Sequence, residues 1–187
     1  MKKIFIALMC MCVAMMCTAC STETSFTTET KVSASVNSLQ DLLDKGNQNL
    51  NANKPDDAIK NYTAAIEIDA DSAEAYNGRG IAYAQKHDFA AAIKDFGQAI
   101  KFAQNPAEAY SNRGQAYADS GDAQKALADF NKSIETDAKN DTAYVNRGVL
   151  HYNAGDTDKA VADFRKALEI NPNNTDAKKA LEHAAAN

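Results

Sequence analysis

Cysteine and histidine carry the most specific chemistry in this 187-residue chain, and their positions restrict what it does. All four cysteines lie within the first twenty residues, at Cys10, Cys12, Cys17 and Cys20. The rest of the chain therefore has no thiol for a disulfide, a zinc site or a nucleophile.

The three histidines, His87, His151 and His183, do not form the i,i+4 pair that a helical zinc site uses. The sequence also lacks a glycine-rich phosphate loop and a nucleophile elbow. We therefore expect no catalytic residues, no metal site and no cofactor. An enzyme without these signatures is the weakest of the functional alternatives.

The N-terminus has the pattern of a secretory signal peptide over residues 1–19. Lys2 and Lys3 precede thirteen apolar residues, 4–16, and small residues follow at 17–19. A membrane-spanning helix needs roughly 20 apolar residues, so a permanent transmembrane helix is the weaker alternative.

Residues 17–20, with the sequence CTAC, resemble the lipobox of bacterial lipoproteins. The resemblance implies cleavage before Cys20 and acylation of its thiol, which anchors the mature chain to a membrane. Cys17 departs from the motif, because lipoproteins usually have leucine or another aliphatic residue at that position. Cleavage after Ala19 to give a soluble secreted or periplasmic protein, with Cys20 unmodified, stays open.

Residues 20–37 follow the signal, and we predict a flexible tether there because serine and threonine are abundant and no apolar period is sustained. Removing residues 1–19 takes away two lysines and no acid, so the net charge falls from -5 to -7. A chain this acidic is a poor ligand for nucleic acid.

From about residue 38 the sequence repeats every 34 residues, which indicates a repeat architecture. The spacing is carried by glycine, alanine and a large aromatic residue, at Gly46, Gly80, Gly114 and Gly148; Ala58, Ala92, Ala126 and Ala160; and Tyr62, Phe96, Phe130 and Phe164. Glycine within a helix costs about 1 kcal/mol relative to alanine, so its recurrence predicts a close helix crossing. The alanines and aromatics are the predicted core.

Apolar residues three, four and seven positions apart predict two helices in each repeat. We expect helices near 38–53, 55–69, 72–86, 88–101, 106–119, 122–136, 140–153, 156–169 and 174–185. Gly121 and Gly155 suit the left-handed position after a helix, and Asp122 and Asp156 suit the N-cap of the next one. Pro55 and Pro106 suit first helical positions.

These residues resemble the tetratricopeptide repeat family, whose pattern the second repeat shows as AYNGRGIAYAQKHDFAAAIKDFGQAI. The resemblance covers about 38–174 and implies an all-α, right-handed α-solenoid of four hairpins. The repeats are 39–72, 73–106, 107–140 and 141–174, and residues 175–187 form a capping helix. The first repeat has Leu42 where the later repeats have tyrosine, and Asn49 where the next two repeats have tyrosine, so its first helix is expected to be the loosest.

Three arginines directly precede glycines of the 34-residue period. An aspartate lies sixteen residues after each arginine. The pairs are Arg79 and Asp95, Arg113 and Asp129, and Arg147 and Asp163. Acids that recur in phase with the arginines favour a ladder of ion pairs inside the solenoid. The alternative is three arginines that face an acidic ligand.

The family resemblance implies that the concave surface is lined by the first helix of each hairpin. The corresponding positions are Asn77, Ile81 and Gln85; Ser111, Asn112, Gln115 and Asp119; and Val145, Asn146, Val149, Tyr152 and Asn153. Asn112 and Asn146 occupy positions where some relatives hold a ligand's backbone, and an amide both donates and accepts. The basic clamp that some relatives use for a C-terminal carboxylate is not matched, since Leu43 and Asn146 occupy two of its positions.

The sequence thus predicts a protein–protein interaction scaffold that is anchored to the bacterial cell envelope through Cys20. Its partner is a peptide or helix of unknown identity, and the outer membrane is the favoured location over the inner membrane. The alternative from another class is an architectural protein that self-associates into a homo-oligomer.

Overall fold

The computed structural model describes residues 38–185, which contain helices and no strand. The chain divides into two compact units, Met1–Asp41 and Leu42–Asn187. Of the first unit, only residues 38–41 are described, and they are helical. The predicted signal peptide, Cys20 and the predicted tether lie outside the described residues.

Every predicted helix is present, and each boundary lies within two residues of the expected one. After a helix over residues 38–51, the helices are α2 (Pro55–Ile68), α3 (Ala73–Gln85), α4 (Phe89–Phe102), α5 (Ala107–Asp119), α6 (Ala123–Thr136), α7 (Asp141–Asn153), α8 (Thr157–Ile170) and α9 (Thr175–Ala185). None of them has the length and apolar character that crossing a membrane requires, as far as the described residues go.

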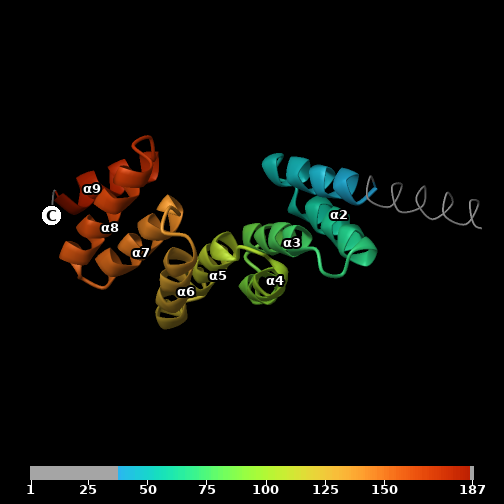
Figure 1. Ribbon diagram of the computed structural model, residues 1–187, viewed down its shortest axis with the longest axis horizontal. Helices are drawn as coiled ribbons and strands as arrows, with labels where there is room; N and C mark the ends of the chain where they lie inside the picture. The colour runs from blue at the N-terminus through green and yellow to red at the C-terminus, as the bar shows by residue number, and fades with distance from the viewer. Residues whose placement is uncertain (1–37, 186–187) are drawn as a thin grey trace, which may run out of the picture. The chain divides into compact units, whose positions relative to one another are not determined.

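The helices of the second unit stack in pairs that follow one another along the chain (Figure 1). The closest packing joins α3 with α4, α5 with α6, and α7 with α8, and each pair contacts the next. The first helices also contact one another, α3 with α5, α5 with α7, and α7 with α9. Among the described helices, α4, α6 and α8 do not contact one another. This arrangement is the predicted α-solenoid, with the first helices joined along one side.

The core is built from aromatic rings that lie against glycines, as the repeat period predicts. Phe96, Phe130 and Phe164 are almost fully buried, and Tyr62 is completely buried. A Cβ atom added to Gly114 would lie 2.8 Å from the Phe130 ring, and Gly46, Gly80 and Gly148 have equivalent contacts. The four alanines of the period are buried as well. Glycine is therefore needed for the helix crossing within each pair.

The turn between the two helices of a repeat uses a left-handed residue in all four repeats. Gly121 and Gly155 have φ angles of 91° and 85°, as predicted. At the same register, Asn53 and His87 have φ angles of 54° and 60°, although neither is glycine. The turn geometry is thus common to the repeats. His87 adopts a left-handed conformation, which is unfavourable for most residues that have a side chain.

The predicted N-cap is confirmed at Asp122, whose side chain accepts a hydrogen bond from the Lys125 backbone N–H at 3.1 Å. Asp156 occupies the N-cap position of α8 as predicted, but its side chain makes no cap bond. One of its carboxylate oxygens accepts instead from Lys159 Nζ at 2.8 Å.

Of the two prolines expected at first helical positions, only Pro55 occupies that position. Pro106 lies one residue earlier, as the N-cap of α5. Asn105 supplies the missing acceptor there, since its Oδ1 accepts from the backbone N–H of Ala107 at 3.2 Å.

Candidate functional site

The predicted binding residues belong to α3, α5 and α7, the helices that contact one another along one side of the solenoid. We call their accessible residues the first-helix face. Its exposed members are Gln85, Gln115, Asp119, Val149 and Asn153, and its partly exposed members are Asn77, Ile81, Asn112, Asn146 and Tyr152.

Two predicted contact residues, Ser111 and Val145, do not reach this face. Ser111 is 3% exposed and Val145 is 7% exposed. Val145 packs in a cluster with Tyr144, Ala167 and Ala177. Neighbouring helices therefore cover both positions, and a partner could not touch them in this structure.

A chain of amide hydrogen bonds joins α3 to α5 on the first-helix face. Asn112 Nδ2 donates to Asn77 Oδ1 at 3.0 Å, and Asn77 Nδ2 donates to Glu108 Oε1 at 3.0 Å. In the described part of the chain, Asn146 has no such hydrogen bond, because the register of Asn77 is occupied by the short, buried Ser111. The amide of Asn146 is therefore the one better placed to bind a peptide backbone.

The N-terminal part of the face contains a pocket of about 370 Å³, which we call the amide pocket. It is lined by Asn47, Ala73, Glu74, Asn77, Gly78, Ile81, Ala99, Ala103, Asn105, Glu108 and Ala109. Only Asn77 and Ile81 were predicted as contact residues. Glu74 and Glu108 are 34 residues apart, so the repeat period contains a signal that could have identified them.

Next to the amide pocket, the buried Tyr62 hydroxyl donates to Asn47 Oδ1 at 2.7 Å. Burial, together with the negative charge of Glu74, raises the pKa of Tyr62 to about 12. The equivalent positions in later repeats are phenylalanines, which have no hydroxyl. A Cβ atom on Gly78 would lie only 2.3 Å from Tyr62 Cζ, so this ring excludes any larger residue at position 78.

The C-terminal part of the face contains a second, mainly apolar pocket of about 250 Å³. Its lining consists of Val149, Tyr152, Asn153, Phe164, Ala180 and His183. The rings of Tyr152 and His183 lie with their centroids 5.5 Å apart. Three predicted contact residues, Val149, Tyr152 and Asn153, therefore share one concave surface.

The predicted ladder of ion pairs is confirmed. Arg113 donates from Nε to Asp129 Oδ2 at 2.7 Å and from Nη2 to Asp129 Oδ1 at 2.9 Å. The pairs Arg79 with Asp95 and Arg147 with Asp163 have the same two-point geometry. Hydrogen bonding to the aspartate raises the pKa of each arginine. These arginines are committed to the solenoid rather than presented to an acidic ligand.

Two of these arginines also connect successive repeats. Arg79 Nη1 donates to Thr63 Oγ1 at 3.2 Å, and Arg147 Nη1 donates to Asn131 Oδ1 at 2.7 Å. Gly97 of the second repeat has the same register as Thr63 and Asn131. A Cβ atom added to Gly97 would lie 3.8 Å from Arg113 Nη1. Arg113 therefore lacks this inter-repeat bond because Gly97 has no side chain.

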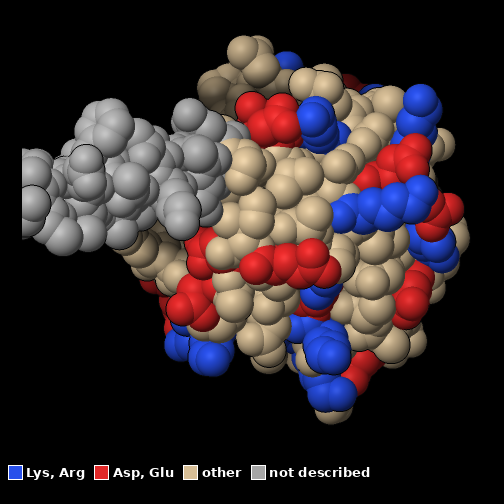
Figure 2. Space-filling view, turned by 90° about the vertical axis from the view of Figure 1, so that its right-hand side faces the viewer, with Lys and Arg blue, Asp and Glu red and all other residues tan. Residues whose placement is uncertain are grey.

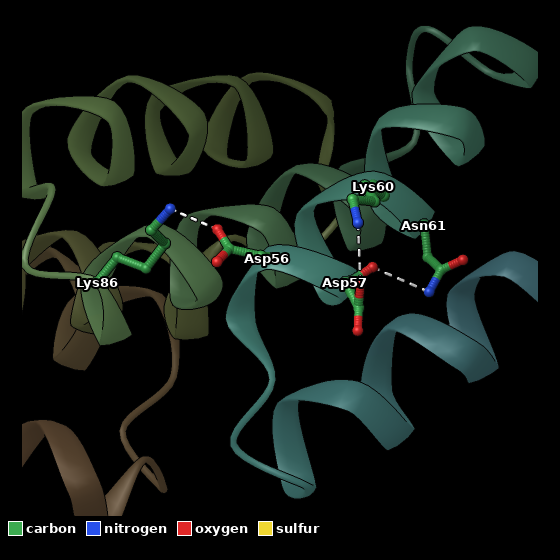
Figure 3. Close-up of polar contacts among 5 residues, drawn as sticks. All are labelled: Asp56, Asp57, Lys60, Asn61 and Lys86. Atoms are coloured by element: carbon green, nitrogen blue, oxygen red, sulfur yellow. Dashed lines mark hydrogen bonds and ion pairs between the residues drawn. The ribbon is translucent and has the colours of Figure 1, made fainter.

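Two exposed ion pairs lie on α2 and at the turn after α3 (Figure 3). Lys86 pairs with Asp56 of the preceding repeat, and Lys60 pairs with Asp57 within α2. The hydrogen bond from Lys86 lowers the pKa of Asp56. Both pairs are solvent-exposed, and such pairs contribute little to stability.

Figure 2 shows acidic and basic groups interspersed over the end of the molecule that it views, with no large basic patch there. Within the described residues, no three His, Cys, Asp or Glu side chains are arranged to hold a metal ion. His151 lies 4.0 Å from the carboxylate of Asp156, and His183 lies beside Tyr152. The structure therefore does not bring the three histidines into one site.

Comparison with known proteins agrees with this geometry. Models of the tetratricopeptide repeat match residues 43–109, 107–140 and 142–174. A crystal structure of MamA is 32% identical and covers 76% of this chain and 80% of that chain, with a TM-score of 0.64. PilF of Pseudomonas aeruginosa is 15% identical and covers 82% of this chain and 70% of its own, with a TM-score of 0.74.

A third similar structure is the first repeat domain of Spaghetti (RPAP3), bound to an HSP90 peptide. It is 22% identical and covers 63% of this chain and 94% of that chain, with a TM-score of 0.58. The family models together span well over half of the sequence. On this basis, the chain belongs to the tetratricopeptide repeat family, whose members are interaction scaffolds.

Proposed function

We propose that this protein is a membrane-anchored scaffold of the bacterial cell envelope, which binds a peptide or helix of another protein on the first-helix face. The observation that carries the proposal is the contact of α3, α5, α7 and α9 along one side. Side chains from successive repeats thereby form one continuous surface that a single elongated ligand can contact.

The chemistry of the face supports a peptide ligand. It combines amide side chains, which both donate to and accept from a peptide backbone, with two concave pockets of different polarity. The similar structure that holds an HSP90 peptide supports the same class of ligand. No residue of the first-helix face is arranged for covalent chemistry, so binding is the proposed activity.

The proposed anchor is a lipid on Cys20, after removal of residues 1–19. Outer-membrane attachment is the favoured location, with a soluble secreted or periplasmic protein as the alternative. Labelling with radioactive palmitate tests the anchor, and we expect incorporation in the natural chain and none in Cys20→Ala. Equal labelling of both chains would exclude Cys20 as the acylated residue.

Site-directed photo-crosslinking in the cell envelope tests the binding face. A photoreactive residue at Gln115, which is exposed on α5, should form adducts with another protein. The matched control is Glu135, which is exposed on α6, a second helix. Adducts of equal yield at both positions would contradict the proposal, and adducts containing only this chain would favour the self-associating architectural alternative.

A further inference from the structure

The amide pocket has a chemical character that identifies its ligand more narrowly than the proposed function does. Two of its lining residues, Glu74 and Glu108, are acidic, and none is lysine or arginine. Glu108 accepts one hydrogen bond, from Asn77. Within the described part of the chain, Glu74 has neither a hydrogen bond nor an ion pair. Carboxylate oxygens are therefore available to an incoming donor.

Residues of three successive repeats line the pocket, and the combination of Asn47, Tyr62 and Gly78 at its wall is not repeated at the equivalent positions of the later repeats. Gly78 lies where the next two repeats have Asn112 and Asn146, so no side chain fills this position. Tyr62 lies against Gly78, and its hydroxyl holds Asn47 at the pocket wall with a 2.7 Å hydrogen bond. Buried packing thus fixes the part of the wall formed by Gly78, whereas the side chains of Glu74 and Glu108 are exposed.

The two helix N-termini beside the pocket do not reverse its charge. Ala73 and Ala107 begin α3 and α5, and each N-terminus is equivalent to roughly half a positive charge. Glu74 and Glu108 bring two full negative charges in the first turns of the same helices. The sum is about one net negative charge, which favours a cation. Burial, and after it the negative charge of Glu74, raises the pKa of Tyr62 beside the pocket.

The shape also fits a long basic side chain. Ala99, Ala103 and Ile81 give the pocket an apolar portion on which a methylene stem can pack. Lysine and arginine side chains combine such a stem with a charged end. The volume of about 370 Å³ lies within the range of pockets that enclose small ligand groups.

We infer that the amide pocket binds a lysine or arginine side chain of the partner segment, with the cationic end held by Glu74 and Glu108. This inference rests on the proposed function, because the basic side chain belongs to the peptide on the first-helix face. The inference also orients the partner segment on the first-helix face. Its basic residue lies beside repeats one to three, and another part of the segment lies toward the apolar pocket near the C-terminal helices.

The test measures fluorescence anisotropy of labelled nonapeptides of alternating serine and alanine, added to the full-length protein. The central residue is arginine, its uncharged isostere citrulline, or glutamate. We expect the arginine peptide to bind about tenfold more tightly than the citrulline peptide, because charge-assisted hydrogen bonds are stronger than neutral ones. The glutamate peptide should bind most weakly, and added salt should reduce the preference for arginine.

The decisive variant is Glu74→Gln with Glu108→Gln, which removes both charges and retains the shape and the acceptor for Asn77. It should bring the arginine and citrulline peptides to within about twofold. The matched control, Glu135→Gln with Glu169→Gln, changes the net charge equally at exposed positions on α6 and α8. It should retain the preference for arginine.

The outcomes separate this inference from the proposed function. Equal binding of all three peptides, or loss of the preference in the Glu135 and Glu169 control, would overturn the inference and leave peptide binding on the face intact. Absence of binding by every peptide would also overturn the inference, and the crosslinks at Gln115 would still decide the proposed function. Crosslinks concentrated on the second helices would refute the function whatever the peptides show.

Discussion

The junction between the first and second repeats differs from the next junction at four positions of identical register. The first junction has Asn47, Tyr62, Thr63 and Gly78, and the second has Ile81, Phe96, Gly97 and Asn112. At the first, a tyrosine ring lies between Gly46 and Gly78, and its hydroxyl bonds to Asn47. At the second, the phenylalanine ring meets Gly80, and Asn112 carries a side chain where Gly78 has none.

The difference shows how one tyrosine restricts the residues that can lie beside it in two other helices. A buried hydroxyl needs a hydrogen-bond partner, which Asn47 supplies. A helix that approaches the tyrosine ring as closely as α3 does needs glycine at position 78. Gly78 thus leaves its part of the pocket wall without a side chain, whereas the equivalent Asn112 carries an amide that donates to Asn77.

The largest effect is expected where the packing common to all four repeats is broken. Phe130→Ala removes a ring that is 1% exposed and lies against Gly114. We expect a loss of about 3 to 5 kcal/mol in the free energy of unfolding, which urea denaturation followed by circular dichroism measures. The surface substitution Gln115→Ala is the control, and an equal loss in both would contradict the core assignment.

Gly78→Asn should break the first junction by giving it the residue of the second. The new Cβ would lie 2.3 Å from the Tyr62 ring, so helix α3 must move away. We expect a loss of about 1 to 3 kcal/mol in the free energy of unfolding, as for other overpacked sites. The reciprocal control, Asn112→Gly, introduces no clash and should cost about 1 kcal/mol, mainly through loss of the hydrogen bond to Asn77, because asparagine is already a poor helix former. A smaller loss for Gly78→Asn than for Asn112→Gly would show that the two junctions are packed alike.

Tyr62→Phe should make the first junction resemble the second and should cost about 1 kcal/mol through loss of the hydroxyl hydrogen bond. It should also change the dependence of stability on alkaline pH. Because the folded protein holds the Tyr62 proton up to about pH 12 and the unfolded chain releases it near pH 10.0, the natural chain loses stability across this window.

Urea unfolding at pH 8 and at pH 11 tests the tyrosine prediction. The natural chain should lose more stability than Tyr62→Phe between these two values, and the difference between the two chains should shrink as pH rises. An unchanged difference would mean that the Tyr62 hydroxyl titrates as it does in the unfolded chain.

Gly97→Asn should give the second junction the arginine contact that Thr63 provides at the first. A Cβ at position 97 is at an ordinary 3.8 Å from Arg113 Nη1, and Asn131 makes the equivalent bond to Arg147. We expect a gain of about 0.5 to 1 kcal/mol from the hydrogen bond and from the removal of a helical glycine. The control Gly97→Val has a helix propensity close to that of asparagine and no hydrogen-bonding group, so equal stability of the two variants would exclude the added bond.

The repeat period predicted those features that depend on one repeat and its own core. The helices, the aromatic rings against glycines and the arginine–aspartate pairs each follow from residues that recur in phase. The period did not predict that Ser111 and Val145 are buried, because it does not define how far the neighbouring helix covers a position. Asn47, Glu74 and Glu108 were missed for the same reason, since their pocket is formed by three successive repeats.

Local chemistry also decided some details that pattern alone could not. Asp122 and Asp156 have the same register, yet only Asp122 accepts a cap bond, with one oxygen on the backbone N–H and the other on the side chain of Lys125. His87 was assigned to a turn, but its positive φ became visible only in the structure. A left-handed backbone is set by the helices on either side, and histidine accepts it at some conformational cost.

The one-sided contacts between successive repeats also have a mechanical consequence. When successive repeats contact one another through only one row of helices, the spacing within that row is restrained, and the spacing within the other row is restrained less. Among the described helices, α3, α5, α7 and α9 contact one another in succession. In contrast, within this part of the chain, α4, α6 and α8 contact only the helices directly before and after them. Thermal bending should therefore concentrate in the spacing of the outer helices, which lets the inner surface widen or narrow around ligands of different girth while its contacts stay intact.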